Sequence, residues 1–390
     1  MQKIKNILTI IKWTILSAAI GLVGGLSSLL MAIIIKYFPE KNNIFLIPII
    51  FFISGFFVDK IYELKGSGVD RVLKALNYNI NLSWKIGILK TILSSLVIAV
   101  GGSCGKEGPC VQSSASFADE IHRMLKLKNR ELVIITGIAG GLSGAFSAPL
   151  GTAILACEII EKEDFRYVNL IPPMMASVFS YAVFYVITHK KHLFEYLPHY
   201  CFDPIDIFWF LFGAIFCSII ASFYIKTYKT ISNYFDNITI PYAIKSLLGG
   251  IVVATIGYFL PEILGMGVIL VKELFMIKFS LIFLLFLLIG KVLATSFTVG
   301  SGTPGGLVFP SICVGAISGA LFSSIFALNP TPFIVLGMAT ALSASLNAPL
   351  GSAVLCTEMF GFDFAIPSSI GAVIGYQVTR FETVFKYVRF

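Results

Sequence analysis

One stretch decides the fold: Gly101-Gly102-Ser103-Cys104-Gly105-Lys106-Glu107-Gly108-Pro109. Its glycines and its two charged residues separate two long helix-compatible runs. It follows the apolar residues 86–100 and precedes a helix-compatible run over 109–125. A charged side chain at membrane depth costs about 2.5–3.5 kcal/mol or more, so such residues usually mark a functional site. Glycines before a helix start leave backbone N–H groups available to an anion. The sequence therefore predicts an anion site here, with Glu107 as a carboxylate that competes for it.

Composition indicates a membrane protein. Of the 390 residues, 57% are hydrophobic and 13% are charged, and the mean hydropathy is +0.88. A soluble domain has roughly 25% charged residues, and a membrane span needs about 20 largely apolar ones. Apolar runs that could cross all or most of a bilayer recur over residues 7–35, 44–58, 86–100, 170–187, 205–225 and 279–293. We therefore expect an all-α polytopic membrane protein in contact with the lipid bilayer.

The first apolar run allows two interpretations. Residues 1–18 resemble a signal peptide, since Lys3 and Lys5 precede an apolar stretch. The run continues without a clear small-residue cleavage site, which favours a retained first helix. No soluble domain fits in the remainder of the chain, so we expect a compact multi-pass protein of a prokaryotic plasma membrane, without a cytoplasmic regulatory domain.

The net charge of +8 and the seven cysteines indicate no cofactor. Basic residues in 60–74, 122–130 and 226–229 fit the tendency of cytoplasmic loops to be positive, although a basic excess would also favour the approach of anions. The cysteines are odd in number and lack CxxC spacing, which argues against zinc and against a disulfide framework. Because no metal cluster or nucleophile–base pair is evident, we expect neither an enzyme nor a nucleic-acid partner.

The same signals occur twice. Two halves with short helices broken by glycine and proline are the signature of transporters built from internal repeats, which bind their substrate at the repeat interface. We place the halves at 1–240 and 241–390. A spacing of 199 to 201 residues links Gly66 with Gly265, Lys90 with Lys291, Gly105 with Gly305, Pro149 with Pro349 and Glu158 with Glu358. The pattern predicts helices in the first half over 1–36, 44–61, 70–76, 84–100, 109–125, 132–141, 149–161, 167–187 and 205–234.

Three glycine-rich loops, 66–69, 105–109 and 305–310, each precede a short helix. One alternative is close helix packing through small residues. Partial matches to the P-loop and to GxGxxG fail on spacing and on context. Recurrence in both halves favours helix starts that converge, each carrying about half a positive charge. Such an arrangement would hold an anion without a cationic side chain.

Two polar side chains in these loops are candidates for the site. Ser67 has a hydroxyl where its repeat partner Met266 has none; the alternative role for Ser67 is an ordinary helix N-cap. Glu107 could be a buried carboxylate paired with Lys106 or Lys90. Its helix start favours the charged form and desolvation favours the neutral form, so it could alternate between filling the anion site and carrying a proton.

Four further charged residues lie in apolar helices and repeat between the halves. For Glu158 and Glu358 a matched structural role, such as bonding to neighbouring backbone amides, is favoured over transport chemistry. The same holds for Lys90 and Lys291, with a background attractive potential for anions as the alternative.

These motifs resemble those of the CLC chloride channels and transporters. Residues 66–69 resemble the family's GSGIP motif, residues 105–109 resemble G(K/R)EGP, and residues 305–310 resemble GGxFxP, with Val308 at the usual Phe position. The resemblance extends from the first helix to the C-terminus. It implies an inverted-topology repeat with many tilted and broken helices, a homodimer, and one pathway for chloride in each subunit.

The resemblance also implies roles for individual residues. Glu107 would be the external gating glutamate and the proton carrier. Ser67 would donate its hydroxyl to the central anion, and the backbone N–H groups of Leu307 and Val308 would complete that site. The chloride-binding residues implied by the resemblance are Ser67, Gly105, Lys106, Gly108, Gly306, Leu307, Val308, Phe309 and Phe385.

Two positions depart from the family pattern. The C-terminal tyrosine that donates a second hydroxyl aligns with Phe385, although another register places Tyr387 there. The inner proton-relay glutamate of the exchangers aligns with Ile159, and Glu158 and Glu161 are the nearest acids. The fluoride-exporting branch typically lacks the serine of the first motif, so Ser67 favours chloride. The sequence thus predicts chloride/proton exchange, with a passive voltage- or pH-gated chloride channel of the same fold as the alternative.

Overall fold

The computed structural model describes residues 2–38, 43–160, 167–189, 194 and 200–388, and this part of the chain forms sixteen α-helices and no named strand. The first eight helices are α1 (Gln2–Tyr37), α2 (Leu46–Lys60), α3 (Gly68–Asn77), α4 (Trp84–Ala99), α5 (Glu107–Leu125), α6 (Arg130–Phe146), α7 (Pro149–Ile160) and α8 (Ile171–Thr188). The other eight are α9 (Asp206–Asn237), α10 (Tyr242–Phe259), α11 (Val268–Met276), α12 (Leu281–Gly300), α13 (Val308–Ile325), α14 (Pro330–Leu346), α15 (Pro349–Phe360) and α16 (Ala365–Val378). The all-α fold predicted from the sequence is confirmed.

Six of these helices are long and apolar enough to cross a membrane. Others are too short, since the 12 residues of α7 or α15 rise only about 18 Å. Large apolar side chains such as Phe52, Phe208 and Phe286 are exposed on α2, α9 and α12. Extensive exposed apolar surface is rare in soluble proteins, so these faces are suited to lipid.

Two of the differences between predicted and observed helix ends bear on the site. The helix expected over 109–125 begins at Glu107, which places the carboxylate in the first turn. The helix expected over 132–141 runs from Arg130 to Phe146, because its glycines pack against neighbours and do not break it. For example, a Cβ at Gly141 would collide with the backbone of Cys110 on α5. Small residues at such contacts let membrane helices approach closely.

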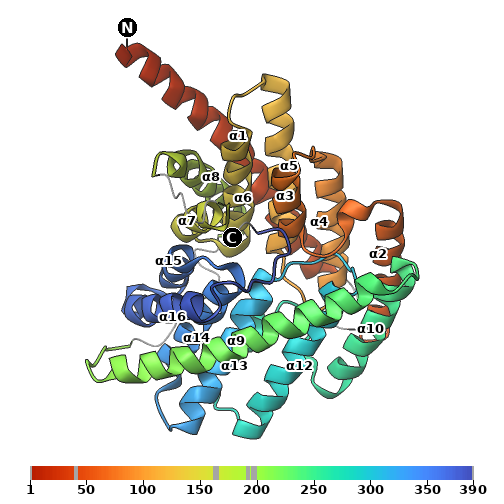
Figure 1. Cartoon of the computed structure of the whole chain (residues 1–390), viewed down its shortest axis with the longest axis vertical. Coiled ribbons are helices and arrows are strands. Elements are labelled where there is room, and N and C mark those ends of the chain that lie inside the picture. The colour runs from red at the N-terminus through yellow and green to blue at the C-terminus, as the bar shows by residue number, and fades with distance from the viewer. Residues whose placement is uncertain (1, 39–42, 161–166, 190–193, 195–199, 389–390) are drawn as a thin grey trace.

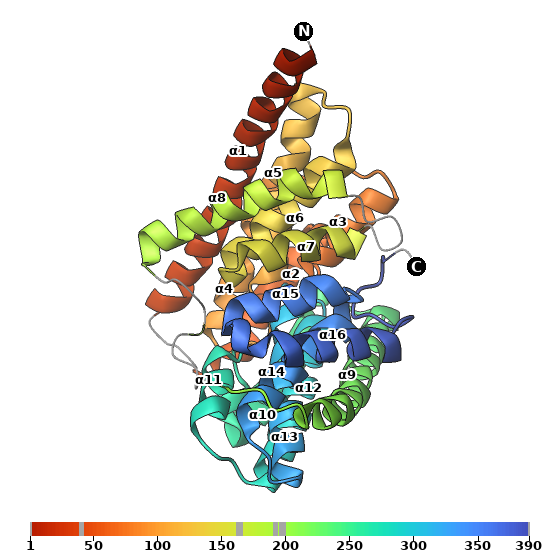
Figure 2. The ribbon, with the colours of Figure 1, turned by 90° about the vertical axis from the view of Figure 1, so that its left-hand side faces the viewer.

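The two halves have matching architecture (Figures 1 and 2). In the first half, α1 packs against α5, α6 and α8; in the second, α9 packs against α13, α14 and α16. Figure 1 shows α9 lying across α12, α13 and α14. The neighbours of α9 thus parallel those of α1, and the boundary of the halves at residue 240 stays a prediction from the motif spacing.

Helices α7 and α15 join the halves at the centre of the molecule (Figure 2). The Glu158 carboxylate of α7 accepts the N–H groups of Leu350 and Gly351 at 3.0 and 2.7 Å. Reciprocally, Glu358 of α15 accepts those of Leu150 and Gly151 at 3.1 and 2.8 Å. Each glutamate thus caps the start of the opposite helix, where the macrodipole favours a negative charge. This is the backbone-bonding role predicted for the pair.

Removing one of these caps should destabilise the interface between the halves. We expect Glu358→Ala to cost about 1–3 kcal/mol, because it leaves two backbone donors without their charged partner. Glu358→Gln retains one acceptor oxygen and should lose less. Thermal unfolding in detergent should therefore rank wild type above Glu358→Gln, and Glu358→Gln above Glu358→Ala. Equal melting temperatures would contradict the capping role.

Candidate functional site

The three glycine-rich loops meet at one point of the structure. Gly105 and Gly306 form an antiparallel bridge, in which each N–H donates to the other's carbonyl at 2.9 and 2.8 Å. The Gly305 N–H donates to the Gly66 carbonyl at 3.3 Å. A Cβ at Gly68 would collide with the Gly108 carbonyl, which only a glycine avoids. The starts of α3, α5 and α13 are therefore held together, as the motif pattern predicts.

The Glu107 carboxylate lies at this meeting point and is 1% exposed. Its Oε1 accepts the N–H of Phe309, in the first turn of α13, at 2.8 Å. A Cβ at Gly105 or Gly306 would collide with the carboxylate, so the two glycines form a cradle around it. Oε2 has no hydrogen-bond partner among the described residues. A carboxylate of the first half thus occupies a position at a helix start of the second half that suits an anion.

Leu307 and Val308 lie where the resemblance places anion donors. Leu307 is the N-cap residue of α13 and Val308 is its first residue, and both are buried. The first N–H groups of a helix have no partner within it. The Phe309 ring stacks on Phe146 and Phe194, which closes this side of the site with aromatic surface.

Ser67 is the N-cap residue of α3, but its side chain makes no capping hydrogen bond. Its hydroxyl oxygen is buried and has no partner among the described residues, and the side chain is 2% exposed. The alternative role of an ordinary N-cap is therefore wrong for this hydroxyl. A buried hydroxyl without a partner costs free energy, which a bound ligand can recover.

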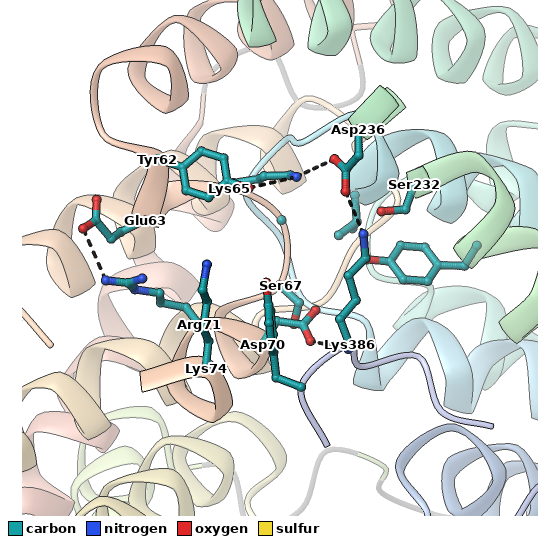
Figure 3. Close-up of a pocket in the computed structure, with 14 residues that line it drawn as sticks. Tyr62, Glu63, Lys65, Ser67, Asp70, Arg71, Lys74, Ser232, Asp236 and Lys386 are labelled. Carbon is teal, nitrogen blue, oxygen red and sulfur yellow. Dashed lines mark hydrogen bonds and ion pairs between the residues drawn. The ribbon is translucent and has the colours of Figure 1, made fainter. Parts of the chain in front are cut away.

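Ser67 faces a vestibule of about 690 Å³, a volume that includes its opening to solvent (Figure 3). Ion pairs hold its walls: Lys65 and Lys386 both pair with Asp236, and Arg71 pairs with Glu63 at 3.2 Å. The charged residues that line it are Glu63, Lys65, Asp70, Arg71, Lys74, Asp236 and Lys386. With four basic and three acidic side chains, the vestibule has a slight excess of positive charge.

The buried lysines Lys90 and Lys291 donate hydrogen bonds to backbone carbonyls and do not pair with Glu107. Lys90 donates to the carbonyl of Lys65 at 3.2 Å, and Lys291 donates to the carbonyl of Gly265 at 2.9 Å. Each lysine thus supports the glycine loop of its own half, in the structural role predicted from the repeat. The Lys106 ammonium donates to Ser28 at 3.3 Å and lies 5.1 Å from the centre of the Phe184 ring.

The C-terminal segment passes beside the start of α3. The Val384 N–H donates to the Ser345 carbonyl at 3.0 Å, and the Lys386 N–H donates to Asp70 Oδ1 at 2.8 Å. Phe385, between them, is 2% exposed, whereas Tyr387 lines the vestibule together with Ser67. The buried position beside α3 is therefore held by a side chain without a hydroxyl.

Ile159, which the resemblance aligns with the inner proton-relay glutamate, is buried beside a small cavity that Glu131 and Tyr387 also line. Glu158 caps α15, and Glu161 lies outside the described residues. Sequence reasoning missed Glu131, because an acidic residue in the first turn of a helix has an ordinary structural explanation. No group of three or more His, Cys, Asp or Glu side chains that could hold a metal occurs within the described ranges.

Fold and site together are those of an anion-transporting membrane protein, and comparison with known proteins agrees. The family model described as voltage gated chloride channel matches residues 50–380, so the chain belongs to the voltage-gated chloride channel (CLC) family. Members of this family are transporters and channels, not enzymes.

Relatives include proteins of archaea and bacteria. The chain is 69% identical to an uncharacterized protein of Methanocaldococcus jannaschii, over 98% of this chain and 96% of that protein. It is 24% identical to the H(+)/Cl(-) exchange transporter ClcA of Vibrio campbellii, over 83% of this chain and 74% of that protein.

Two solved structures have the same fold. A CLC-type fluoride/proton antiporter matches with a TM-score of 0.81 and 19% identity, over 97% of this chain and 98% of that chain. A slow cyanobacterial Cl⁻/H⁺ antiporter matches with a TM-score of 0.83 and 19% identity, over 94% of each chain.

A double-mutant cycle tests the cradle. The three heavy atoms nearest to a Cβ at Gly105 all belong to the Glu107 side chain. Gly105→Ala should therefore lower thermal stability in the wild type and much less in a Glu107→Ala background, with a coupling energy of at least about 1 kcal/mol. Gly290→Ala, whose Cβ would meet the flexible Leu260 side chain, is the control. If Gly105→Ala lowered thermal stability equally in both backgrounds, the carboxylate would not lie against Gly105.

Proposed function

We propose that this protein exchanges chloride for protons across the membrane, and that Glu107 both gates the anion pathway and carries the proton. The observation that supports this most strongly is the position of its carboxylate, which accepts the Phe309 N–H in a cradle of two glycines. An ionised Glu107 and a chloride ion would compete for the same backbone donors. Protonation of Glu107 would weaken its hydrogen bond from the Phe309 N–H, because a neutral carboxyl is a poorer acceptor than a carboxylate.

The anion path in this proposal runs from the vestibule past Ser67 to the Glu107 cradle. The unpartnered Ser67 hydroxyl and the N–H groups at the start of α13 would bind chloride on the way. Neutral donors and helix dipoles attract an anion without the tight pairing that a lysine ammonium would impose, so the ion can also leave. Ser67 is the reason to favour chloride over fluoride.

The alternative function, a passive chloride channel of the same fold, draws support from two positions. Ile159 offers no carboxylate for an inner proton relay, and Phe385 offers no hydroxyl to an inner gate. In the exchange proposal, protons would instead reach Glu107 through water and through acids of the two cavities, Asp70 and Glu131. The homodimer stays a prediction from the resemblance, and the prokaryotic plasma membrane stays a prediction from the sequence.

Proton coupling distinguishes the two functions. In proteoliposomes, a chloride gradient should drive uphill proton movement through the wild type, whereas Glu107→Gln should move chloride without protons because the amide cannot carry one. Glu120→Gln is a matched control, since Glu120 lies on the same helix but pairs with Arg123 at its exposed end. A wild type that conducts chloride and moves no protons would establish the channel instead.

Ser67→Ala tests the anion path. It should weaken chloride binding by about 1–3 kcal/mol, the contribution of one hydrogen bond to a charged group, measured by titration calorimetry. Ser83→Ala is the control, because Ser83 is also an N-cap residue without a side-chain capping bond, on α4 and outside the vestibule. An unchanged affinity in Ser67→Ala would remove Ser67 from the site.

A further inference from the structure

Helix α9 has a polar stripe on one face. Tyr224, Tyr228, Ser232 and Asp236 follow one another at intervals of four residues, so they lie on the same side of the helix. The first three are 0%, 3% and 4% exposed. Phe208, Phe212, Ile215, Ile219 and Phe223 are exposed on α9, and they give it an apolar face suited to lipid.

The stripe leads from the vestibule into the protein. Tyr228, Ser232 and Asp236 line the vestibule, and Figure 3 shows Ser232 and Asp236 close to Lys386 on the wall of α9. Tyr224 lies one turn beyond Tyr228, past the end of the open space. Tyr224 therefore lies deeper along α9 than the vestibule, within electrostatic range of Glu107.

The Tyr224 hydroxyl is buried and has no hydrogen-bond partner among the described residues. The polar side chains that act on it are Ser311, which lies within range of a loose hydrogen bond, and, at longer range, Glu107 and Cys313; Ser311 and Cys313 lie on α13. Ser311 Oγ already bonds to the Leu307 carbonyl at 2.9 Å. A tyrosine hydroxyl that is fully buried usually finds a partner, so its lack of one indicates a missing ligand.

Tyr224 shares this lack of a partner with Ser67 Oγ, at the start of α3, and with Glu107 Oε2, at the start of α5. Tyr224 and Ser67 carry hydroxyl donors, and Glu107 carries the carboxylate that occupies the anion's place in the proposed function. A monovalent anion that reached both hydroxyls would satisfy them.

We propose that the Tyr224 hydroxyl of α9 binds the transported anion and is the second hydroxyl donor of the site beside Ser67. This inference rests on the proposed chloride pathway. It adds α9 to the elements that line the pathway, beside the three glycine loops. Phe385, near the start of α3, has no hydroxyl to offer, so the donor comes from α9. A neutral phenol adds a directed hydrogen bond without adding a fixed charge that would trap the anion.

Tyr224→Phe tests the proposal because it removes only the hydroxyl. We expect chloride affinity to fall about tenfold in titration calorimetry, since the anion loses one direct donor. The melting temperature in chloride-free gluconate buffer should fall little, because the lost hydroxyl makes no well-formed hydrogen bond with the described residues. The rise in melting temperature on adding chloride should be smaller than in the wild type. Tyr258→Phe is the matched control, on the exposed face of α10.

The outcomes separate this inference from the proposed function. If titration of the wild type with chloride gives no heat of binding, and chloride does not raise its melting temperature, the proposed function fails and this inference fails with it. If the wild type binds chloride and Tyr224→Phe binds it equally well, only the role of Tyr224 is overturned. A lower melting temperature without chloride together with wild-type affinity would show a purely structural role. Tyr224→Met is the second variant should Tyr224→Phe not fold, and the same reduction in affinity is required of it.

Discussion

The backbone pairing of Gly105 with Gly306 is the contact on which the site depends. It joins a loop of the first half to a loop of the second through two hydrogen bonds of 2.9 and 2.8 Å. Only residues without a Cβ can approach in this way while leaving room for the Glu107 carboxylate. The close approach lets a side chain on α5 accept a backbone N–H at the start of α13. The position of the buried Glu107 carboxylate thus depends on close packing of glycines and on the dipole at the start of α13.

The repeat explains which parts of the molecule are matched and which are not. Glu158 and Glu358 cap each other's helices, and Lys90 and Lys291 each hold the glycine loop of their own half. The proposed anion site departs from this symmetry, because the first half would supply Ser67 and Glu107 and the second half would supply backbone donors at the start of α13. A symmetric scaffold therefore carries an asymmetric pathway.

Much of this arrangement could be predicted from the sequence. The apolar runs, the repeat spacing and the three glycine loops predicted the helical fold and the convergence of helix starts. The predicted length of α6 was too short. Its glycines pack against neighbouring helices, and these contacts cannot be seen in the periodicity of the sequence. The roles proposed for Tyr224 and Glu131 could not be predicted, since a tyrosine in a long apolar helix and an acid in the first turn of a helix are ordinary in their local sequence. Their significance comes from neighbours distant in the chain, and only the fold brings these together.

The central claim is that the Glu107 carboxylate occupies a position that an anion takes when the carboxylate is absent. Anomalous diffraction from crystals grown in bromide would test it most directly, by comparing the wild type with Glu107→Ala. We expect a bromide peak in the variant within hydrogen-bond reach of the Phe309 N–H, in the cradle of Gly105 and Gly306. In the wild type we expect no peak there at a pH where Glu107 is ionised. A variant whose cradle stays empty while bromide binds near Ser67 would contradict the claim.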